Sequence, residues 1–284
     1  MSNTLRLLMP QWQGGNNPNY LLGAQLLTWL APNEKNDLVV EVPVESYTGM
    51  KLEKEDGVVA RSVLLQQLRS AQNIIEEHQP DKVIVFGGDC LVSQAPFTYL
   101  NKKYDGKLGV LWLDAHPDVS TPKMFAHAHA MVLGNLLGEG DAQFAAEVEV
   151  PLNPDLVMYG GLNEMTRQEA DIVERLQLRS ASSKELARNS DLVLEWIERN
   201  QIKHVAVHLD LDVLDPKLFR SLLFANPDGT VVNAPQGEMT FDQLSRLFID
   251  ISKKTEIVGL GIAEHLPWDV INLKKFLESI SIFK

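Results

Sequence analysis

Residues 108–118 read LGVLWLDAHPD, an apolar run that ends in acidic residues and a histidine. A short apolar run without alternating polar residues is typical of a strand covered on both faces of a parallel sheet. Six further short runs are also read as strands, and several of them are apolar at nearly every position: 5–9, 38–42, 82–86, 156–159, 204–209 and 257–262. These seven segments are therefore predicted to be strands of a mainly parallel sheet.

Segments with helical periodicity separate these predicted strands. In the segment 58–78, apolar residues at positions 64, 68, 71 and 75 fall on one helix face. The segments 19–30, 183–200, 241–253 and 270–282 show similar patterns. This alternation predicts an α/β fold, with one doubly wound parallel sheet flanked by helices. Because no linker-like stretch interrupts the pattern, residues 1–284 are expected to form a single domain.

The composition of the chain limits which partners and functions are expected. The chain has 26 Lys and Arg against 38 Asp and Glu, a net charge of −12. Nucleic acid and anionic membrane surfaces are therefore not expected partners, whereas a cationic substrate or a metal is. No apolar run approaches the roughly 18 residues that span a bilayer. A single cysteine, Cys90, and a first segment unlike a signal peptide favour a cytoplasmic location.

Side chains able to bind metals follow four of the predicted strands. They are Asp89 and Cys90; Asp114, His116 and Asp118; Asp210 and Asp212; and Glu264. Ligands of such sheets bind at the carboxyl ends of the strands, so these groups should converge. Carboxylates in one crevice repel one another, and divalent cations remove that cost. A lone Asp-x-Asp is usually a cap or a turn, but two acidic motifs after separate strands favour a metal site.

The same motifs resemble those of the ureohydrolase family, which includes arginase, agmatinase and formimidoylglutamase. Residues 87–90 (GGDC), 114–118 (DAHPD) and 208–216 (HLDLDVLDP) are similar to the family's Gly-Gly-Asp-His, Asp-Ala-His-x-Asp and Asp-x-Asp-x-x-Asp-Pro motifs. Residues 129–138 and 260–264 resemble its His-Gly-x-Pro segment and the strand that carries its active-site glutamate. The resemblance runs from about residue 87 to 264 and implies an arginase-like three-layer fold.

The resemblance also implies roles for individual residues. The metal ligands would be Cys90, Asp114, His116, Asp118, Asp210 and Asp212. Asp114 and Asp210 would bridge two divalent ions, usually Mn²⁺. Glu264 would face the nitrogen of the substrate, and His129 would shuttle protons, with His127 as the alternative.

The implied reaction is hydrolysis of a C–N bond in a linear guanidino or amidine compound. A hydroxide bridging the two metals would attack the central carbon, because two ions lower the pKa of a shared water toward about 7. The substrate would be small and cationic. Proteins of this family are commonly trimers or hexamers, so a homo-oligomer is expected.

Cys90 stands where the family usually has a metal-binding histidine. Its thiolate could ligate and shift the preference toward cobalt, nickel, iron or zinc. Alternatively the centre holds one metal, or Cys90 is a small buried hydrophobe beside a site that binds none. Ala130 and Val132 replace the family's Gly and Pro, and Phe125 is apolar where a polar contact is expected. These changes argue against arginine itself as the substrate.

Two other functions remain open from the sequence. The altered Cys90 and loops are compatible with a pseudoenzyme that has a binding or regulatory role. A deacetylase-like metal amidohydrolase is a further alternative, although none of the tyrosines lies in a supporting motif.

Several residues near these motifs receive structural interpretations. Asp215 and Pro216 are interpreted as the N-cap and first residue of a helix. His204, His208 and His265 are interpreted as packing or surface residues.

Overall fold

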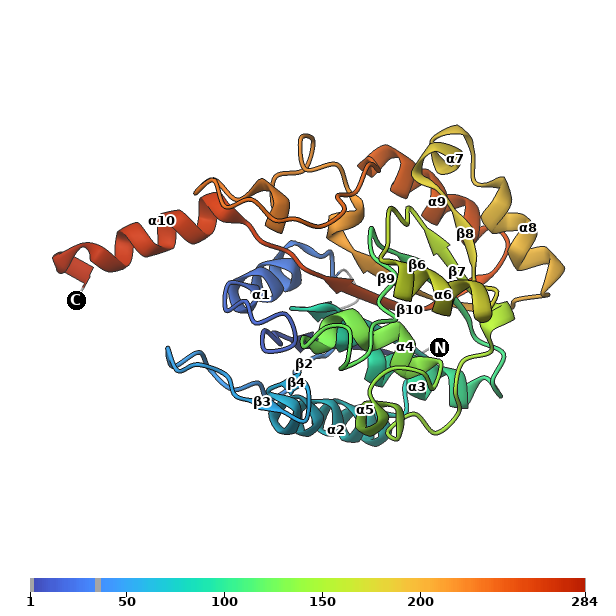
Figure 1. Cartoon of the computed structure of the whole chain (residues 1–284), viewed down its shortest axis with the longest axis horizontal. Coiled ribbons are helices and arrows are strands. Elements are labelled where there is room, and N and C mark those ends of the chain that lie inside the picture. The colour runs from blue at the N-terminus through green and yellow to red at the C-terminus, as the bar shows by residue number, and fades with distance from the viewer. Residues whose placement is uncertain (1–2, 34–36, 284) are drawn as a thin grey trace.

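An eight-stranded sheet, parallel throughout, forms the centre of the computed structural model, which describes residues 3–33 and 37–283 (Figure 1). The strand order is β2-β1-β5-β10-β9-β6-β7-β8. The strands are β1 (Thr4–Met9), β2 (Val39–Glu41), β5 (Lys82–Gly87), β6 (Gly109–Leu113), β7 (Val157–Gly160), β8 (Arg179–Ala181), β9 (His204–Asp210) and β10 (Glu256–Ala263). The predicted α/β fold is confirmed, and each of the seven predicted strands is present.

Helices cover both faces of the sheet, as a doubly wound topology requires (Figure 1). They are α1 (Tyr20–Leu30), α2 (Arg61–His78), α3 (Gln94–Lys103), α4 (Val132–Leu136), α5 (Ala142–Ala145), α6 (Arg167–Arg175), α7 (Ser183–Arg188), α8 (Asp191–Arg199), α9 (Phe241–Ser252) and α10 (Trp268–Ser279). In the view of Figure 1, α2, α3, α4 and α5 lie below the sheet, and α7, α8 and α9 lie above it.

The apolar face predicted for the segment 58–78 packs into the core. Leu64, Leu68 and Ile75 of α2 are at most 1% exposed and join Val83 and Val85 of β5 in one cluster. Burying side chains of this size stabilises the fold by about 1.5–3 kcal/mol each. The helix begins only at Arg61, because residues 58–59 form the strand β4 of a small hairpin with β3 (Lys54–Glu55).

Three predictions about elements need correction. Asp215 and Pro216 do not begin a helix; Asp215 accepts a hydrogen bond from the Lys217 amide at 2.8 Å within a turn. The predicted helix at 183–200 is two helices, because Asn189 is extended and its side chain accepts from the Asp191 amide. The short edge strand β8 escaped prediction because it lacks an apolar run.

The last helix differs from the others in its surroundings. Its first turn is buried, with Trp268 and Ile271 in a cluster that also holds Trp12 and Tyr20. The rest of α10 extends away from the sheet (Figure 1). Among the described residues, no helix combines the length and apolar character needed to cross a bilayer.

Candidate metal centre

The four strands that carry the predicted ligands are the four central neighbours of the sheet, β5, β10, β9 and β6. Because all four are parallel, their carboxyl ends meet at one edge, and the polar residues that follow them converge there. The turn after β5 needs glycine: a Cβ on Gly88 would lie 1.6 Å from the backbone oxygen of Gln11. The topology therefore brings these segments together, as predicted.

Potential ligand atoms gather there in three overlapping groups, each with its atoms within 4.8 Å of one another. The groups are Cys90, Asp114, His208 and Asp210; Asp114, His116 and Asp212; and Asp210, Asp212 and Glu264. Asp114, Asp210 and Asp212 each belong to two groups. Carboxylates shared in this way suit adjacent cations, since each has two oxygens to offer.

Local hydrogen bonds hold these carboxylates in place. Asp114 accepts from the His116 amide at 2.7 Å and from the Trp112 indole at 3.1 Å. Asp210 accepts from the Asp212 amide at 2.7 Å, which starts a short 3₁₀ turn after β9. Both oxygens of Asp114 are thus oriented by nearby donors, and Asp210 keeps its Oδ1 on the Asp212 amide while its Oδ2 faces Cys90.

Among the described residues, no Lys or Arg pairs with the carboxylates of the cluster. The basic side chains within 4 Å of them are histidines: His116 Nδ1 lies 3.0 Å from Asp212, and His129 Nδ1 lies 3.8 Å from Glu264. Burial, together with the Asp212 charge, raises the pKa of Asp114 to about 6 and that of Glu264 to about 8. A buried carboxylate set of this kind fits divalent cations, which would stabilise its charged form.

Cys90 lies inside the cluster. Its Sγ is 2.9 Å from Asp210 Oδ2 and 3.7 Å from Glu264 Oε1. Burial and the Asp210 charge raise the pKa of this thiol, so it keeps its proton unless a cation is bound nearby. The thiol therefore lies among the potential metal-binding side chains of the cluster.

Asp118 and Glu264 have a backbone feature that the sequence did not reveal. Their φ angles are 51° and 62°, in the left-handed region that non-glycine residues rarely adopt. Such conformations cost of order 1–3 kcal/mol and cluster at functional sites. Asp118 is outside the three groups, but its Oδ2 is buried without a hydrogen-bond partner and it lines the same cavity.

His208 is more than the packing residue predicted. It does pack, with its ring stacked on Trp112 at 3.8 Å and Nδ1 2.7 Å from Ser93 Oγ. Its Nε2, however, is directed to Asp114 at 3.8 Å and makes no hydrogen bond. Period-two alternation places His208 and Asp210 on the same side of β9, a signal that could have identified it. His265 is a packing residue, as predicted: its Nδ1 donates to Gly23 O at 3.1 Å, and its ring stacks on Phe219.

A cavity of about 770 Å³ opens over the cluster. Its floor holds Cys90, His116, Asp118, Asp210, Asp212 and Glu264. His127 and His129 line it, as do the apolar Phe125 and Phe224 and the acidic Glu164 and Glu169. The structure thus brings every predicted ligand except Asp114, which is fully buried beneath, to the wall of one cavity.

Known proteins resemble this chain in sequence. The Arginase family model matches residues 18–269. An arginase of Entamoeba histolytica is 23% identical over 202 residues, 68% of this chain and 65% of that protein. An arginase of Staphylococcus aureus is 25% identical over 143 residues, 47% of this chain and 46% of that protein. The chain therefore matches about half the length of the first curated relatives.

Solved structures share the fold. The arginase of Bacillus caldovelox has a TM-score of 0.78 at 18% identity, covering 94% of this chain and 92% of that one. A putative agmatinase of Clostridium difficile has a TM-score of 0.64 at 15% identity, covering 98% and 93%. The family model spans most of the chain, and the fold and the motif order agree with it. This chain belongs to the arginase family.

Proposed function

We propose that this protein hydrolyses a C–N bond of a linear guanidino or amidine compound at a centre of two divalent metals. The supporting observation is the buried carboxylate cluster beneath a cavity that also holds Glu264 and His129. The proposed ligands are Cys90, Asp114, His116, Asp118, Asp210 and Asp212. When bound, two such ions supply a water of lowered pKa as the nucleophile.

Glu264 and His129 have separate roles in this proposal. The Glu264 carboxylate accepts hydrogen bonds from the cationic head of the substrate, which favours its charged form. Burial, followed by the neighbouring His127, lowers the pKa of His129 to about 3, so its imidazole is neutral at pH 7. Its Nδ1 has no hydrogen-bond partner, which leaves it able to exchange a proton at the leaving amine.

The residues of the cavity walls favour some substrates over others. Phe125 and Phe224 offer apolar contact, and Glu164 and Glu169 add negative charge away from the metal cluster. This lining suits a small cationic compound with an apolar body better than it suits arginine. We expect Mn²⁺ as the resident metal, with Cys90 widening the choice toward cobalt, nickel, iron or zinc.

Elemental analysis and a substrate panel test the proposal together. Purified protein supplied with manganese or cobalt should bind one to two ions per chain and release urea or ammonia from a guanidine or amidine. The Asp114→Ala variant should lose both properties, whereas Asp171→Ala, at an exposed position on α6, should keep both. Metal-loaded protein that turns over none of the panel would favour the pseudoenzyme instead.

A further substitution isolates the cysteine. Cys90→His should bind more manganese, relative to cobalt or zinc, than the unsubstituted chain, because imidazole is a harder ligand than thiolate. Equal metal ratios in the two proteins would show that the thiol is not a ligand.

A further inference from the structure

Helix α10 leaves an apolar stripe uncovered. Its exposed members are Val270 (41% exposed), Leu273 (55%), Phe276 (59%) and Leu277 (39%). Their spacing of three, three and one residues puts them on one side of the helix, with Lys275 on the other. An amphipathic helix of this kind normally buries its apolar side.

The first turn of α10 fixes the direction of the helix. The Trp268 indole donates to Leu222 O at 2.6 Å, and Trp268 and Ile271 are buried beside Tyr20. From this anchored turn the helix runs away from the sheet (Figure 1). The apolar stripe is therefore carried outward as a rigid extension of the subunit.

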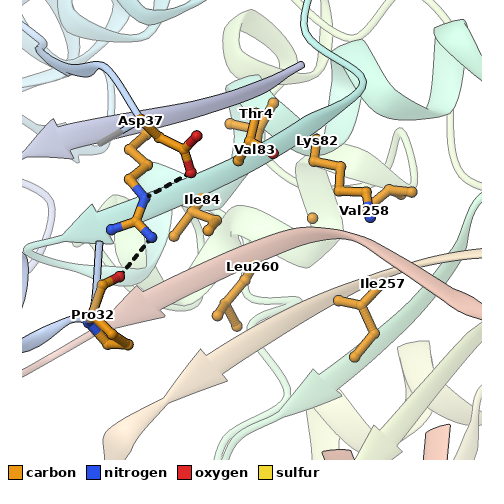
Figure 2. A pocket seen from close by; sticks show the side chains of 11 residues that line it. Thr4, Pro32, Asp37, Lys82, Val83, Ile84, Ile257, Val258 and Leu260 are labelled. Atoms are coloured by element: carbon orange, nitrogen blue, oxygen red, sulfur yellow. Dashed lines mark hydrogen bonds and ion pairs between the residues drawn. The ribbon is translucent and has the colours of Figure 1, made fainter. Parts of the chain in front are cut away.

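A groove of about 500 Å³ lies on the sheet, near the amino ends of β1, β5 and β10. Figure 2 shows Ile84 and Leu260 on its floor. These two residues and Arg6 form one cross-strand row. The Arg6 guanidinium is paired with Asp37 at 3.6 Å and donates to Pro32 O at 2.7 Å, so the charge beside the floor is satisfied.

The groove lies on a part of the sheet that no helix of its own subunit covers. Helices α1 and α9 cover neighbouring parts of the same face, and their Leu27 and Leu247 share an apolar cluster with Leu260. A helix after a parallel strand usually packs back on the sheet. Here α10 follows β10 without doing so, and the face beside β10 is the part left open.

We propose that α10 of one copy of this chain docks its apolar stripe in the groove of a second copy. The groove of its own subunit stays uncovered, because the anchored first turn directs α10 away from the sheet. Both surfaces are on every copy, so the exchange can be reciprocal.

The apolar stripe of α10 and the groove are large enough to form a stable interface. A 12-residue helix is about 18 Å long and about 10 Å across, so burying half of its side removes roughly 300 Å² from the helix and a similar area from the groove. Two reciprocal contacts bury about 1,200 Å², the lower end of stable specific interfaces. A cavity of about 150 Å³ holds one benzene ring, so the groove accepts about three side chains of that size.

Light scattering on the full chain is the first test. The mass should correspond to more than one chain, and Leu273→Gln with Phe276→Gln should shift the assembly toward single chains, weakening it at least about 100-fold. The matched control, Lys275→Gln with Glu278→Gln, changes the other side of α10 and should not. A single-chain mass, or a mass unaffected by the apolar pair, would overturn the proposal.

Photocrosslinking identifies the occupant of the groove. A benzophenone side chain at position 276 should crosslink to peptides that contain Ile84 or Leu260. In a mixture of isotope-labelled and unlabelled protein, these crosslinks should join labelled to unlabelled peptides. Crosslinks within one chain, or to neither peptide, would contradict docking on a second copy. Docking is independent of catalysis, so these results stand whether or not the protein is active.

Discussion

Two hollows of this molecule border the same two strands but suit opposite ligands. At the carboxyl ends of β5 and β10, Cys90 and Glu264 line a cavity crowded with buried carboxylates. Near the amino ends, Ile84 and Leu260 form an apolar floor. The rim charge Lys82 is already paired with Glu256 at 2.7 Å. From this comparison we expect unpaired buried charge to favour ions, and paired charge around apolar atoms to favour a protein surface.

The largest effect should come from breaking the charged cavity. Asp212→Ala removes a carboxylate shared by two ligand groups, so activity should fall at least about 10³-fold with loss of bound metal. Ile84→Ala, at the groove, should leave both unchanged. Steady-state rates and metal content measure the difference. An Asp212→Ala protein with full metal content would show that Asp212 is not needed to bind metal.

The proton-transfer role should show a smaller effect. His129→Asn should lower kcat about 10²-fold while metal content stays constant, because His129 is near Glu264 but outside the three ligand groups. The variant should also lose one limb of the pH–rate profile. His127→Asn is the control, and a greater loss there would assign the proton shuttle to His127.

The charged cavity should also make the metal-free protein sensitive to pH. Glu264 has its pKa raised from 4.5 to about 8 in the folded state, so its stabilising contribution is complete below pH 4.5 and is lost as pH rises through 8. Between about pH 5 and 8 the free energy of unfolding should fall by up to about 1.4 kcal/mol per pH unit for this group, and it should level off above pH 8.

Urea unfolding of chelated protein at pH 5, 6, 7, 8 and 9 measures this decline and its end. Glu264→Gln should make it shallower, and added metal should oppose it because the ion favours the charged carboxylates. A decline of equal slope in the variant would assign it to other groups.

The smallest effect is expected at the groove floor. Ile84→Val removes one methyl group from a half-buried side chain, so it should cost about 0.5 kcal/mol or less. Ile75→Val, at a fully buried position on α2, should cost about 1 kcal/mol. Denaturant midpoints at low protein concentration compare the two. At high concentration the Ile84→Val cost should increase if a second copy covers the groove.

Much of the fold was predictable because local patterns carry it. The apolar runs at 82–86, 108–113 and 204–209 predicted buried parallel strands. The acidic motifs after them predicted that their side chains converge at one edge of the sheet. The strand β8 and the break at Asn189 were missed because neither is marked by hydrophobic periodicity. His208 was interpreted as a packing or surface residue, although its spacing of two from Asp210 places both on one side of the strand. Its approach to Asp114 depends on the pairing of β9 with β6, which no local pattern encodes.

By itself, the sequence determined the α/β class, the family and the set of groups at the strand ends, since these depend on residue type and spacing. Tertiary structure alone decided that Cys90 lies 2.9 Å from Asp210, 120 residues away, and that Asp118 and Glu264 take left-handed backbone conformations. It also decided that α10 extends outward while a groove beside β10 stays open. Distances between remote segments and the direction of a helix depend on packing across the whole chain, which no local pattern encodes.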